Sequence, residues 1–430
     1  MGKRVLYFVH GHPALRAGGA EQASLELYEA VRDEGEFEPF LAARTDDLAF
    51  ARPGTVFGAV NDDPNQLLFL SRSTGNDYFL HTRADKEFYT THLRRLLETI
   101  RPSIVHFQHT VHTGLESIRQ VRATLPEVPI VYTLHEYLPI CHANGQMMRT
   151  LNFEPCTHAS PRRCHECFPS VEPAQFFLRE RFIKAQLEGV DRFVCPSRFL
   201  LERYAAWGLP REKLVEIDYG RHPVPELAPR QLRSGERRSR FGFFGQLNPY
   251  KGIRELLAAM RVVGESGRGD IHLYVNGANL DIQRQEFREE VEGLLADAAG
   301  NVTVLGTYEQ HELAERMALV DWALVPSIWW ENSPLVIQEA FLHRRPVICN
   351  DIGGMAEKVD DGVSGLHAKV RSPQDLARVL VNAVDTEGLW ERLREGIPQV
   401  PTAAEAAKVH AEIYRELLAE AAPPATAQAA

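Results

Sequence analysis

Long apolar runs are missing from this chain of 430 residues. No stretch approaches the roughly 18 apolar residues that a helix needs to cross a bilayer. An excess of positive charge is also missing, because the formal net charge is −10. This charge argues against a general nucleic-acid binder, and it means that an anionic ligand has to be held by a local positive site. A G-x-G-x-x-G dinucleotide signature and repeats of roughly 20–50 residues are absent as well.

The residues that are present are typical of a soluble globular protein, with 44% hydrophobic and 25% charged residues. A chain of this length exceeds a single hydrophobic core and predicts two or three domains. The apolar run Val5–Val9 follows the first basic residues, but it is too short for a signal peptide and leads into a glycine-containing loop. We interpret this run as a first buried strand and expect a cytoplasmic protein.

Strand-like apolar runs alternate with helical patterns along most of the chain. This alternation predicts an α/β fold whose parallel sheets are covered by helices on both faces. The stretch 45–85 has no clear helical period and predicts loops or short added strands. The expected strands are Val5–Val9, Ile104–Gln108, Pro129–Leu134 and Arg192–Pro196 in the first half, and Arg240–Phe244, Ile271–Val275, Val302–Leu305, Trp322–Val325 and Pro346–Cys349 in the second.

A segment rich in proline and arginine, without apolar periodicity, marks a domain boundary near the middle of the chain. An alanine-rich amphipathic helix and a low-complexity tail end the sequence. The predicted parts are an N-terminal domain at 1–220 with a cysteine-rich insertion at 141–167, a linker at 221–239, a C-terminal domain at 240–398, a crossover helix at 399–420 and a disordered tail at 421–430.

Two glutamates, Glu331 and Glu339, flank the start of a predicted helix. The Asn332–Pro334 stretch holds two favourable N-cap residues and a proline suited to the first helical position, so a helix is expected at Leu335–Leu342. A helix start attracts an anion, and carboxylates beside it can accept hydrogen bonds from sugar hydroxyls. The combination suggests a nucleotide sugar. The alternative is a surface helix with two solvated glutamates.

The surroundings of the two glutamates favour the ligand-binding interpretation. They lie between two apolar runs that predict buried strands, in a βαβ unit whose second strand leads into Gly353-Gly354. Ligands bind outside the carboxyl ends of strands in such sheets. A second candidate loop runs from Gly245 to Lys251, where glycines allow close approach and the lysine supplies a point charge for phosphate. In the N-terminal half, Gly18 and Gly19 let the backbone approach a ligand.

These segments together resemble a known enzyme family. The chain is similar to the large group of retaining glycosyltransferases with the GT-B fold that carry an E-x7-E motif (glycosyltransferase family 4, GT4, or group 1). This resemblance implies two Rossmann-like doubly wound domains that face each other across a cleft. The matching residues are Gly18-Gly19-Ala20-Glu21, Val105-His106, Thr133-Leu134-His135, Pro196-Ser197-Arg198-Phe199, Gly245 to Gly252, Pro326 to Glu339, Gly353-Gly354-Met355-Ala356-Glu357 and Asp361-Gly362.

The resemblance implies a role for each matching residue. Glu339 should accept from the ribose hydroxyls, Glu331 should lie near the donor sugar, and Lys251 should hold the diphosphate. His135 resembles the histidine that contacts the donor sugar, whereas His109 and His112 are weaker candidates and a purely structural histidine is the alternative. The implied catalytic residues are Glu331 and His135, and the implied donor-binding residues are Gly18, Gly19, Gln246, Lys251, Asn332, Ser333, Pro334, Leu335 and Glu339.

The sequence departs from the family at one position. The family pairs an arginine with the lysine, but Gln246 stands there and carries no charge. Either Arg254, another cation or the helix start would compensate. No Asp-x-Asp occurs, so no catalytic metal is expected. The resemblance implies a front-face transfer of a sugar from a UDP- or GDP-sugar to a hydroxyl of a glycan or lipid-linked acceptor, in surface polysaccharide or glycoconjugate synthesis.

Two other functions remain open at this stage. The first is a different enzyme with the same fold, such as a nucleotide-sugar epimerase or a glycan phosphorylase. The second is a catalytically silent module that binds a sugar nucleotide, which the uncharged Gln246 favours and the intact Lys251, Glu331 and Glu339 disfavour. Nothing in the sequence selects the donor base, the sugar or an oligomeric state.

The six cysteines divide into two groups. Cys195 and Cys349 lie in predicted strands and are expected in the core. The other four lie in a hydrophilic segment and end in a C-x2-C pair, which is compatible with a structural zinc site; free thiols are the alternative. These four are Cys141, Cys156, Cys164 and Cys167. The following stretch, 176–184, mixes aromatic and basic residues and allows peripheral contact with the inner face of a membrane; the alternative is a helix packed on its own domain.

Overall fold

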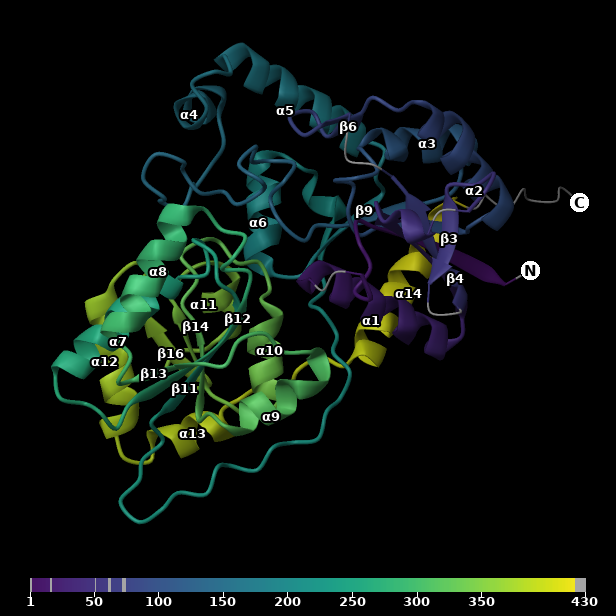
Figure 1. The fold of residues 1–430 in the computed structure, drawn as a ribbon. Coiled ribbons are helices and arrows are strands. Elements are labelled where there is room, and N and C mark those ends of the chain that lie inside the picture. Colours follow the sequence, from purple (N-terminus) through teal and green to yellow (C-terminus); the bar gives the residue numbers. More distant parts are fainter. Residues whose placement is uncertain (1, 16–17, 51, 61–62, 72–74, 422–430) are drawn as a thin grey trace, which may run out of the picture. The chain divides into compact units, whose positions relative to one another are not determined.

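The chain forms two compact units. The computed structural model describes residues 2–15, 18–50, 52–60, 63–71 and 75–421 (Figure 1). Unit 1 is formed by Met1–His222 and Pro401–Ala430, and unit 2 by Pro223–Val400. Of the tail predicted at 421–430, only Ala421 is described, as the last residue of a helix; the others lie outside the described residues.

Unit 1 is built on an eight-stranded sheet in the order β10-β9-β8-β7-β1-β2-β4-β3. All neighbouring strands are parallel except β3 and β4. The strands predicted in the first half are confirmed, and the stretch 45–85 contributes short added strands, as predicted. The strands are β1 (Lys3–Val9), β2 (Phe37–Thr45), β3 (Phe57–Val60), β4 (Asp63–Leu70), β7 (Ile104–Phe107), β8 (Ile130–Thr133), β9 (Arg192–Cys195) and β10 (Leu214–Glu216), with β5 (Asn76–Asp77) and β6 (Thr82–Arg83) in a separate pair.

Helices cover this sheet, and every residue of β7 and β8 is buried, as expected for strands covered on both faces. Among the described residues, no helix combines the length and apolarity needed to cross a membrane. The helical elements of unit 1 are α1 (Gly19–Glu34), η1 (Leu48–Phe50), the π-helical turn η2 (Phe88–Leu93), α2 (Arg94–Ile100), α3 (Glu116–Thr124), α4 (Pro161–Cys167), α5 (Pro173–Leu187), α6 (Arg198–Trp207), η3 (Arg211–Lys213) and α14 (Ala403–Ala421).

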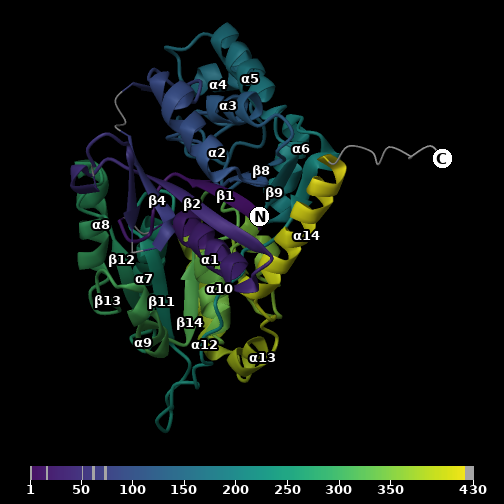
Figure 2. The same ribbon diagram turned by 90° about the vertical axis from the view of Figure 1, so that its right-hand side faces the viewer.

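The C-terminal helix α14 packs on the rest of unit 1, beside α1 (Figure 2). Its small buried residues Ala407 and Ala411 allow close approach to the core around Tyr28. Next to them, the hydroxyl of the fully buried Tyr414 lies 3.0 Å from that of Tyr7 and 2.7 Å from Nδ1 of His106. Helix α14 is therefore joined to the centre of the sheet by polar bonds as well as by apolar packing.

Unit 2 contains a six-stranded, fully parallel sheet in the order β13-β12-β11-β14-β15-β16. Counted along the chain this order is 3-2-1-4-5-6, the order of a doubly wound Rossmann sheet. The strands are β11 (Arg240–Gln246), β12 (His272–Ala278), β13 (Val302–Val304), β14 (Trp322–Val325), β15 (Val347–Asn350) and β16 (Gly365–Ala368), and all five strands predicted in the second half are confirmed. The helices are α7 (Ile253–Glu265), α8 (Gln285–Asp297), η4 (Gln310–Glu312), α9 (Leu313–Ala318), α10 (Leu335–Leu342), α11 (Gly353–Lys358), α12 (Pro373–Asp385) and α13 (Leu389–Glu395).

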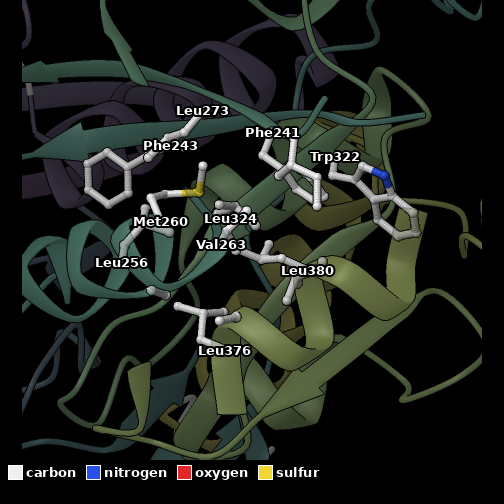
Figure 3. Packing of buried hydrophobic residues seen from close by; sticks show 14 of the residues in the cluster. Phe241, Phe243, Leu256, Met260, Val263, Leu273, Trp322, Leu324, Leu376 and Leu380 are labelled. Atoms are coloured by element: carbon white, nitrogen blue, oxygen red, sulfur yellow. The ribbon is translucent and has the colours of Figure 1, made fainter. Parts of the chain in front are cut away.

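Alternate residues of β14 supply the two cores of unit 2, as the period of a strand requires. Trp322 and Leu324 point toward α7 and α12, where Trp322 stacks on Phe241 with ring centroids 6.1 Å apart (Figure 3). Ala323 and Val325 point to the other face, into a core formed with α9, α10 and α11. The sheet is therefore buried on both sides, and only its loops can carry a ligand site.

The segment predicted as a linker, 221–239, lies largely within unit 2. Arg230 and Arg238 both pair with the buried carboxylate of Asp321, at 3.0 and 3.3 Å. The indole N–H of Trp322 donates to the carbonyl of Arg238 at 2.8 Å. The arginines that suggested a solvated linker thus attach residues 230–238 to the start of β14.

The polar link between α14 and the sheet predicts the effect of one substitution. Tyr414→Phe leaves the Tyr7 hydroxyl and the His106 ring nitrogen buried without this partner. We expect the free energy of unfolding to fall by about 1–3 kcal/mol, as measured by urea denaturation. The same change at the exposed Tyr78 should leave stability unchanged. Equal effects of the two variants would contradict the prediction.

Candidate active site

The carboxyl ends of β11 and β14 form the first candidate site. These two strands are neighbours in the sheet, but the chain winds outward from them in opposite directions. In open α/β sheets, ligands bind in the crevice at such a switch point, because the loops that follow the two strands diverge there. The loop after β11 contains Lys251, and the loop after β14 contains Glu331.

The loop after β11 is held in one conformation by Asn248. Its side-chain oxygen accepts from the backbone N–H groups of Tyr250 and Lys251, at 3.0 and 3.2 Å. Gly252 follows with φ of 71°, and a Cβ at this position would lie 1.8 Å from the carbonyl oxygen of Pro326. Only glycine fits this contact between the two loops. The backbone N–H of Ile328 also donates to the Tyr250 carbonyl, at 2.9 Å.

Lys251 and Glu331 form an ion pair between the two loops. The distance from Nζ of Lys251 to Oε1 of Glu331 is 2.6 Å, and the hydroxyl of Ser327 donates to the same oxygen at 2.7 Å. Glu331 is 5% exposed, whereas the Lys251 side chain is 31% exposed. The lysine can therefore turn to an incoming anion, and the glutamate would then have an oxygen available for a hydroxyl group.

The glycine turn after β15 supports the loop that holds Glu331. The backbone N–H of Gly354 donates to the Glu331 carbonyl at 2.8 Å. A Cβ at Gly354 would lie 1.5 Å from the Asn332 carbonyl oxygen, so this position requires glycine. The side-chain amide of Asn350 donates to the carbonyls of Pro326 and Ser327, at 2.8 and 3.1 Å. Three consecutive strand ends thus shape one site.

The helix predicted after Glu331 is confirmed as α10, with the predicted bounds Leu335–Leu342 but a different cap. Pro334, with ψ of 117°, occupies the N-cap position and not the first helical position. The prediction that Asn332 or Ser333 would be the N-cap is therefore wrong, because the extended backbone of the proline delays the first turn. The first turn of any helix still leaves backbone N–H groups without intrahelical partners, and here they follow directly after Glu331.

Glu339 lies in the second half of α10, beside a different part of the unit. Its carboxylate accepts from the side-chain amide of Gln310 at 3.4 Å. Burial, with a contribution from the charge of Glu339, raises the pKa of Tyr308. Glu339 therefore faces the segment that follows β13, whereas Glu331 faces the loop that follows β11. The two glutamates contact different elements, as different roles would require.

Gln246 ends β11 as an exposed residue, and its side-chain oxygen lies 3.4 Å from the Asn248 amide. Arg254, considered above as a compensating cation, pairs with Glu290 at 3.2 Å and lies over the Phe287 ring. It is thus engaged with α8. Of the two cations considered for this loop, Lys251 is the one bonded into the site.

The carboxyl ends of β1 and β7 form a second polar edge, in unit 1. Here too the strand order reverses. The predicted glycine loop bends around Glu21, because a Cβ at Gly18 would lie 2.3 Å from one carboxylate oxygen, and one at Gly11 would lie 3.3 Å from the other. Gly18 is the N-cap of α1, and Gly19 begins the helix. Residues 16 and 17 of the predicted loop lie outside the described residues.

Glu21 belongs to a cluster of histidines and carboxylates. Nε2 of His10 lies 2.9 Å from Oε1 of Glu21, and the rings of His10 and His109 are 4.6 Å apart. Nδ1 of His109 accepts from the backbone N–H of Val111 at 3.0 Å, so its proton is assigned to Nε2, 3.2 Å from Oε1 of Glu136. The cluster joins three neighbouring strand ends.

Burial favours the neutral form of two members of this cluster. It raises the pKa of Glu136 to about 8 and lowers that of His109 well below its ordinary value. Burial also opposes ionisation of Glu21, but the hydrogen bond and charge of His10, a backbone hydrogen bond and the charge of His109 together outweigh it and lower the Glu21 pKa. Near neutral pH the cluster therefore combines an ionised Glu21 with a largely protonated Glu136.

His135, the predicted sugar contact, uses both ring nitrogens inside unit 1. Nε2 lies 2.9 Å from the Gln108 side-chain oxygen, and Nδ1 lies 2.6 Å from the hydroxyl of Tyr219, on which the ring stacks. Burial lowers the pKa of His135 to about 3, so the ring is neutral. Through Gln108 and His106 it is linked to Tyr414 of α14. The contact of His135 with the donor sugar stays a prediction.

His10 and His112 each have one ring nitrogen that could bind a ligand. Within the described part of the chain, Nδ1 of each is buried without a hydrogen-bond partner. Sequence reasoning ranked His112 low and missed His10, Glu21 and Glu136 as a group. The available signals were modest: His10 directly follows a buried strand, and Glu136 directly follows His135. No spacing rule connects residues that meet only at a sheet edge.

The cysteine prediction is confirmed in part. Cys195 and Cys349 are buried in β9 and β15, as expected for core residues. The other four are partly buried, lie outside any disulfide and line one pocket, and the zinc site stays a prediction. In α5, Phe176 is buried against unit 1, whereas Phe177 and Leu178 are exposed.

The shifted pKa of Glu136 predicts a pH-dependent stability difference. The folded chain keeps a proton that the unfolded chain releases above about pH 4.3. Stability is therefore lost as pH rises from there toward 8, by at most about 1.4 kcal/mol per pH unit. Glu136→Gln stays neutral, so this variant should gain stability relative to the wild type over that range. Thermal unfolding measured from pH 4.5 to 8 checks this.

Two features sharpen the Glu136 test. The groups that face Glu136 are His109, His10 and Arg179 together with the backbone N–H of Leu138, and the substitution leaves all of them in place. Glu127→Gln, in an exposed turn, should show the same pH profile as the wild type. A parallel profile for Glu136→Gln would contradict the assigned pKa shift.

Comparison with known proteins matches this arrangement to one family. The family described as glycosyl transferases group 1 matches residues 238–386, and that described as glycosyltransferase family 4 matches residues 17–221. An alpha-D-kanosaminyltransferase of Streptomyces kanamyceticus is 25% identical over 49% of this chain and 56% of its own length. A lipopolysaccharide 1,2-N-acetylglucosaminetransferase of Salmonella typhimurium is 23% identical over 60% and 58%, respectively. The chain thus spans little more than half the length of these curated relatives.

Solved structures share the fold over nearly the whole chain. A sucrose-phosphate synthase of Thermosynechococcus elongatus gives a TM-score of 0.70 at 17% identity, covering 97% of this chain and 100% of its own. The Anabaena protein HepE, in complex with UDP, gives 0.67 at 16% identity, covering 96% and 100%. The predicted GT-B fold is confirmed. With both family matches and this fold, the chain belongs to the group 1, or family 4, glycosyltransferases.

Proposed function

We propose that this chain is a retaining glycosyltransferase that moves a sugar from a nucleotide-sugar donor to a hydroxyl of a glycan or lipid-linked acceptor. One observation carries the proposal: Lys251 and Glu331 meet at the switch point of the unit 2 sheet, 2.6 Å apart. A cation and a carboxylate at this edge suit a ligand that offers both phosphate and hydroxyl groups.

On donor binding, Lys251 and Glu331 would each replace the other as partner by a group of the donor. Lys251 would turn to the diphosphate, together with the backbone N–H groups at the start of α10. Glu331 would then accept from sugar hydroxyls, with Ser327 holding its carboxylate in place. Glu339, farther along α10, would accept from the ribose hydroxyls. Gln246 would add a neutral hydrogen bond where related enzymes use a charged one.

The chemical step would be a front-face substitution. The acceptor oxygen forms a bond to the anomeric carbon on the face that the diphosphate leaves, and the bond from that carbon to the phosphate oxygen breaks. The acceptor proton passes to the leaving phosphate oxygen, and Lys251 stabilises the charge that develops there. We assign Glu331 no nucleophilic role, because in the donor complex its carboxylate would accept from Ser327 and from the sugar hydroxyls. The configuration of the sugar is retained.

The acceptor side would be formed by the polar edge of unit 1. His10 and His112 each keep an unpartnered buried ring nitrogen there, and the Glu21 carboxylate lies beside His10. Hydroxyl groups of a sugar suit such a mixture of donors and acceptors. The relatives named above act on sugars, and HepE binds UDP, which supports a UDP-sugar as the first donor to test. The lipopolysaccharide transferase among these relatives supports a role in surface polysaccharide synthesis, and our proposal includes a cytoplasmic location.

A catalytically silent sugar-nucleotide binding module is the second candidate. Gln246 favours it, because loss of a bidentate arginine contact weakens the hold on a leaving diphosphate. Binding of a donor without any transfer or hydrolysis would decide for this candidate.

Glu331→Ala tests the catalytic assignment. We expect transfer to fall by at least about 10²-fold, because the contact to the donor sugar and the orientation of Lys251 are lost together. Product formation with a labelled nucleotide sugar measures this, and NMR of the product reports whether the anomeric configuration is retained. Glu315→Ala, on the exposed side of α9, is the matched control and should keep full activity. Wild-type turnover by Glu331→Ala would refute the assignment.

A thermal-shift screen tests donor binding separately from catalysis. UDP-, GDP-, ADP- and dTDP-sugars are compared at equal concentrations. A ligand at 100 times its Kd stabilises the folded chain by about 2.7 kcal/mol, which raises the unfolding temperature by several degrees. We expect the largest shift with a UDP- or GDP-sugar and a reduced shift in Lys251→Ala. No shift with any of the four would contradict the donor site.

A further inference from the structure

The cysteine-rich segment 141–168 follows β8 and contains little that could stabilise it by burial. Its buried side chains are Met147 and Met148. The rest of the segment is partly or fully exposed and, apart from α4, irregular. Short segments without a core of their own depend on cross-links or metal ions to hold one conformation. The structure shows none of its cysteines in a disulfide.

Four thiols of this segment line one pocket. Cys141 and Cys156 come from loops, and Cys164 and Cys167 come from one face of α4, where residues three apart are neighbours. The pocket encloses about 410 Å³ of empty space, part of it open to solvent. Arg149 and Arg163 also line it. The pocket lining therefore combines every cysteine of the segment with two cations.

Local backbone structure brings the four cysteines to this pocket. The backbone N–H of Cys156 donates to the Met147 carbonyl at 2.7 Å, which places Cys156 beside the turn that follows Cys141. Backbone groups of Ala143 and Met147 hydrogen-bond to the sulfur of Cys141. Bonds of this kind orient the sulfur of a metal ligand.

Helix α4 is set up to present the other two thiols. The side chain of Ser160 caps it by accepting from the backbone N–H of Arg163 at 3.4 Å, and Pro161 occupies its first turn. The short helix begins at a defined residue, so Cys164 and Cys167 project from fixed positions. The C-x2-C spacing is one that zinc sites use.

We propose that Cys141, Cys156, Cys164 and Cys167 bind one structural Zn²⁺ ion. Within the described residues, no three His, Cys, Asp or Glu side chains already stand in a metal-binding arrangement. The ion would therefore draw the four sulfurs together by rotation of their side chains into a tetrahedron. Four thiolates around Zn²⁺ leave a net charge of about −2, which Arg163 offsets in part; Arg149, also at the pocket, pairs with Glu166.

The histidines of the segment are less suited to the site. His165 bonds through Nδ1 to the Val171 carbonyl at 2.9 Å, and Nδ1 of His158 lies 3.2 Å from the Thr157 hydroxyl. His142 lines the pocket with a buried, unpartnered Nδ1, but its ring packs among Phe79 and Phe168, at 5.0 and 4.8 Å. Four thiolates complete the coordination of Zn²⁺ without it.

The zinc-bound segment would brace the turn that carries Glu136. Arg179 of α5 donates to the carbonyls of Leu138 and Pro139, at 2.8 and 2.9 Å, directly before Cys141. The backbone N–H of Tyr137 donates to the carbonyl of Gly145, inside the segment. Zinc at the four thiols would therefore stabilise the turn at Glu136 and with it the polar edge of unit 1. The ion would take no part in the transfer itself.

Metal analysis of the full-length chain tests the proposal. Protein purified without chelators should contain about one zinc ion per chain, as measured by inductively coupled plasma mass spectrometry. The double variant Cys164→Ser/Cys167→Ser should contain none, whereas Cys195→Ala and Cys349→Ala, from β9 and β15, should keep it. A zinc-free wild-type chain that stays zinc-free after incubation with Zn²⁺ would overturn the proposal.

A second measurement needs no variant. Replacement of zinc by Co²⁺ in the wild-type chain should give the intense visible absorption of tetrahedral cobalt with thiolate ligands. Removal of the metal by a chelator should lower the unfolding temperature, and Zn²⁺ but not Mg²⁺ should restore it. The four-thiolate assignment would be overturned by absence of this absorption or by a native disulfide among the four cysteines. It would also be overturned if His142→Gln lost zinc while Cys141→Ser retained it.

Discussion

The parallel pairing of β11 with β14 is the constraint on which the site of unit 2 depends. Because the chain winds away from these two strands in opposite directions, their loops diverge at one edge of the sheet. The contact of Gly252 with the Pro326 carbonyl then brings the loops within reach of each other. Lys251 can meet Glu331 only under this condition. Because Glu331 is buried and Lys251 is partly exposed, the lysine is the partner that can turn to an incoming anion.

The same topological rule organises unit 1, with a different chemical outcome. There the reversal lies between β1 and β7, and the edge collects histidines and carboxylates whose charge states differ. The contacts of Glu21 with His10, His109 and the backbone together keep it ionised against its burial, whereas the buried Glu136 keeps a proton up to about pH 8. The buried chain of polar groups from His135 to Tyr414 connects this edge to the C-terminal helix, so that the last helix supports a site near the first strand.

Much of the fold and of the unit 2 site could be predicted because the relevant signals are local. Apolar runs predicted β1, β7, β8 and β9 in unit 1 and every strand of the unit 2 sheet except β16, and the predicted helix Leu335–Leu342 has the bounds of α10. Arg230 and Arg238 were misleading, since arginine-rich segments without periodicity usually remain in solvent. Their partner, the buried Asp321, lies more than eighty positions away, and no local pattern indicates such a pairing.

The sequence by itself determined the family, the alternation of strands and helices, and the candidates Lys251, Glu331 and Glu339, because these follow from short-range patterns of hydrophobicity, capping and glycine. The tertiary structure alone decided which side chains meet. It bonded both ring nitrogens of His135, left Nδ1 of His10 and Nδ1 of His112 buried without a hydrogen-bond partner, and brought four cysteines to one pocket. Burial and proximity between distant segments set these contacts and the charge states that follow, and neither is encoded in the spacing of residues along the chain.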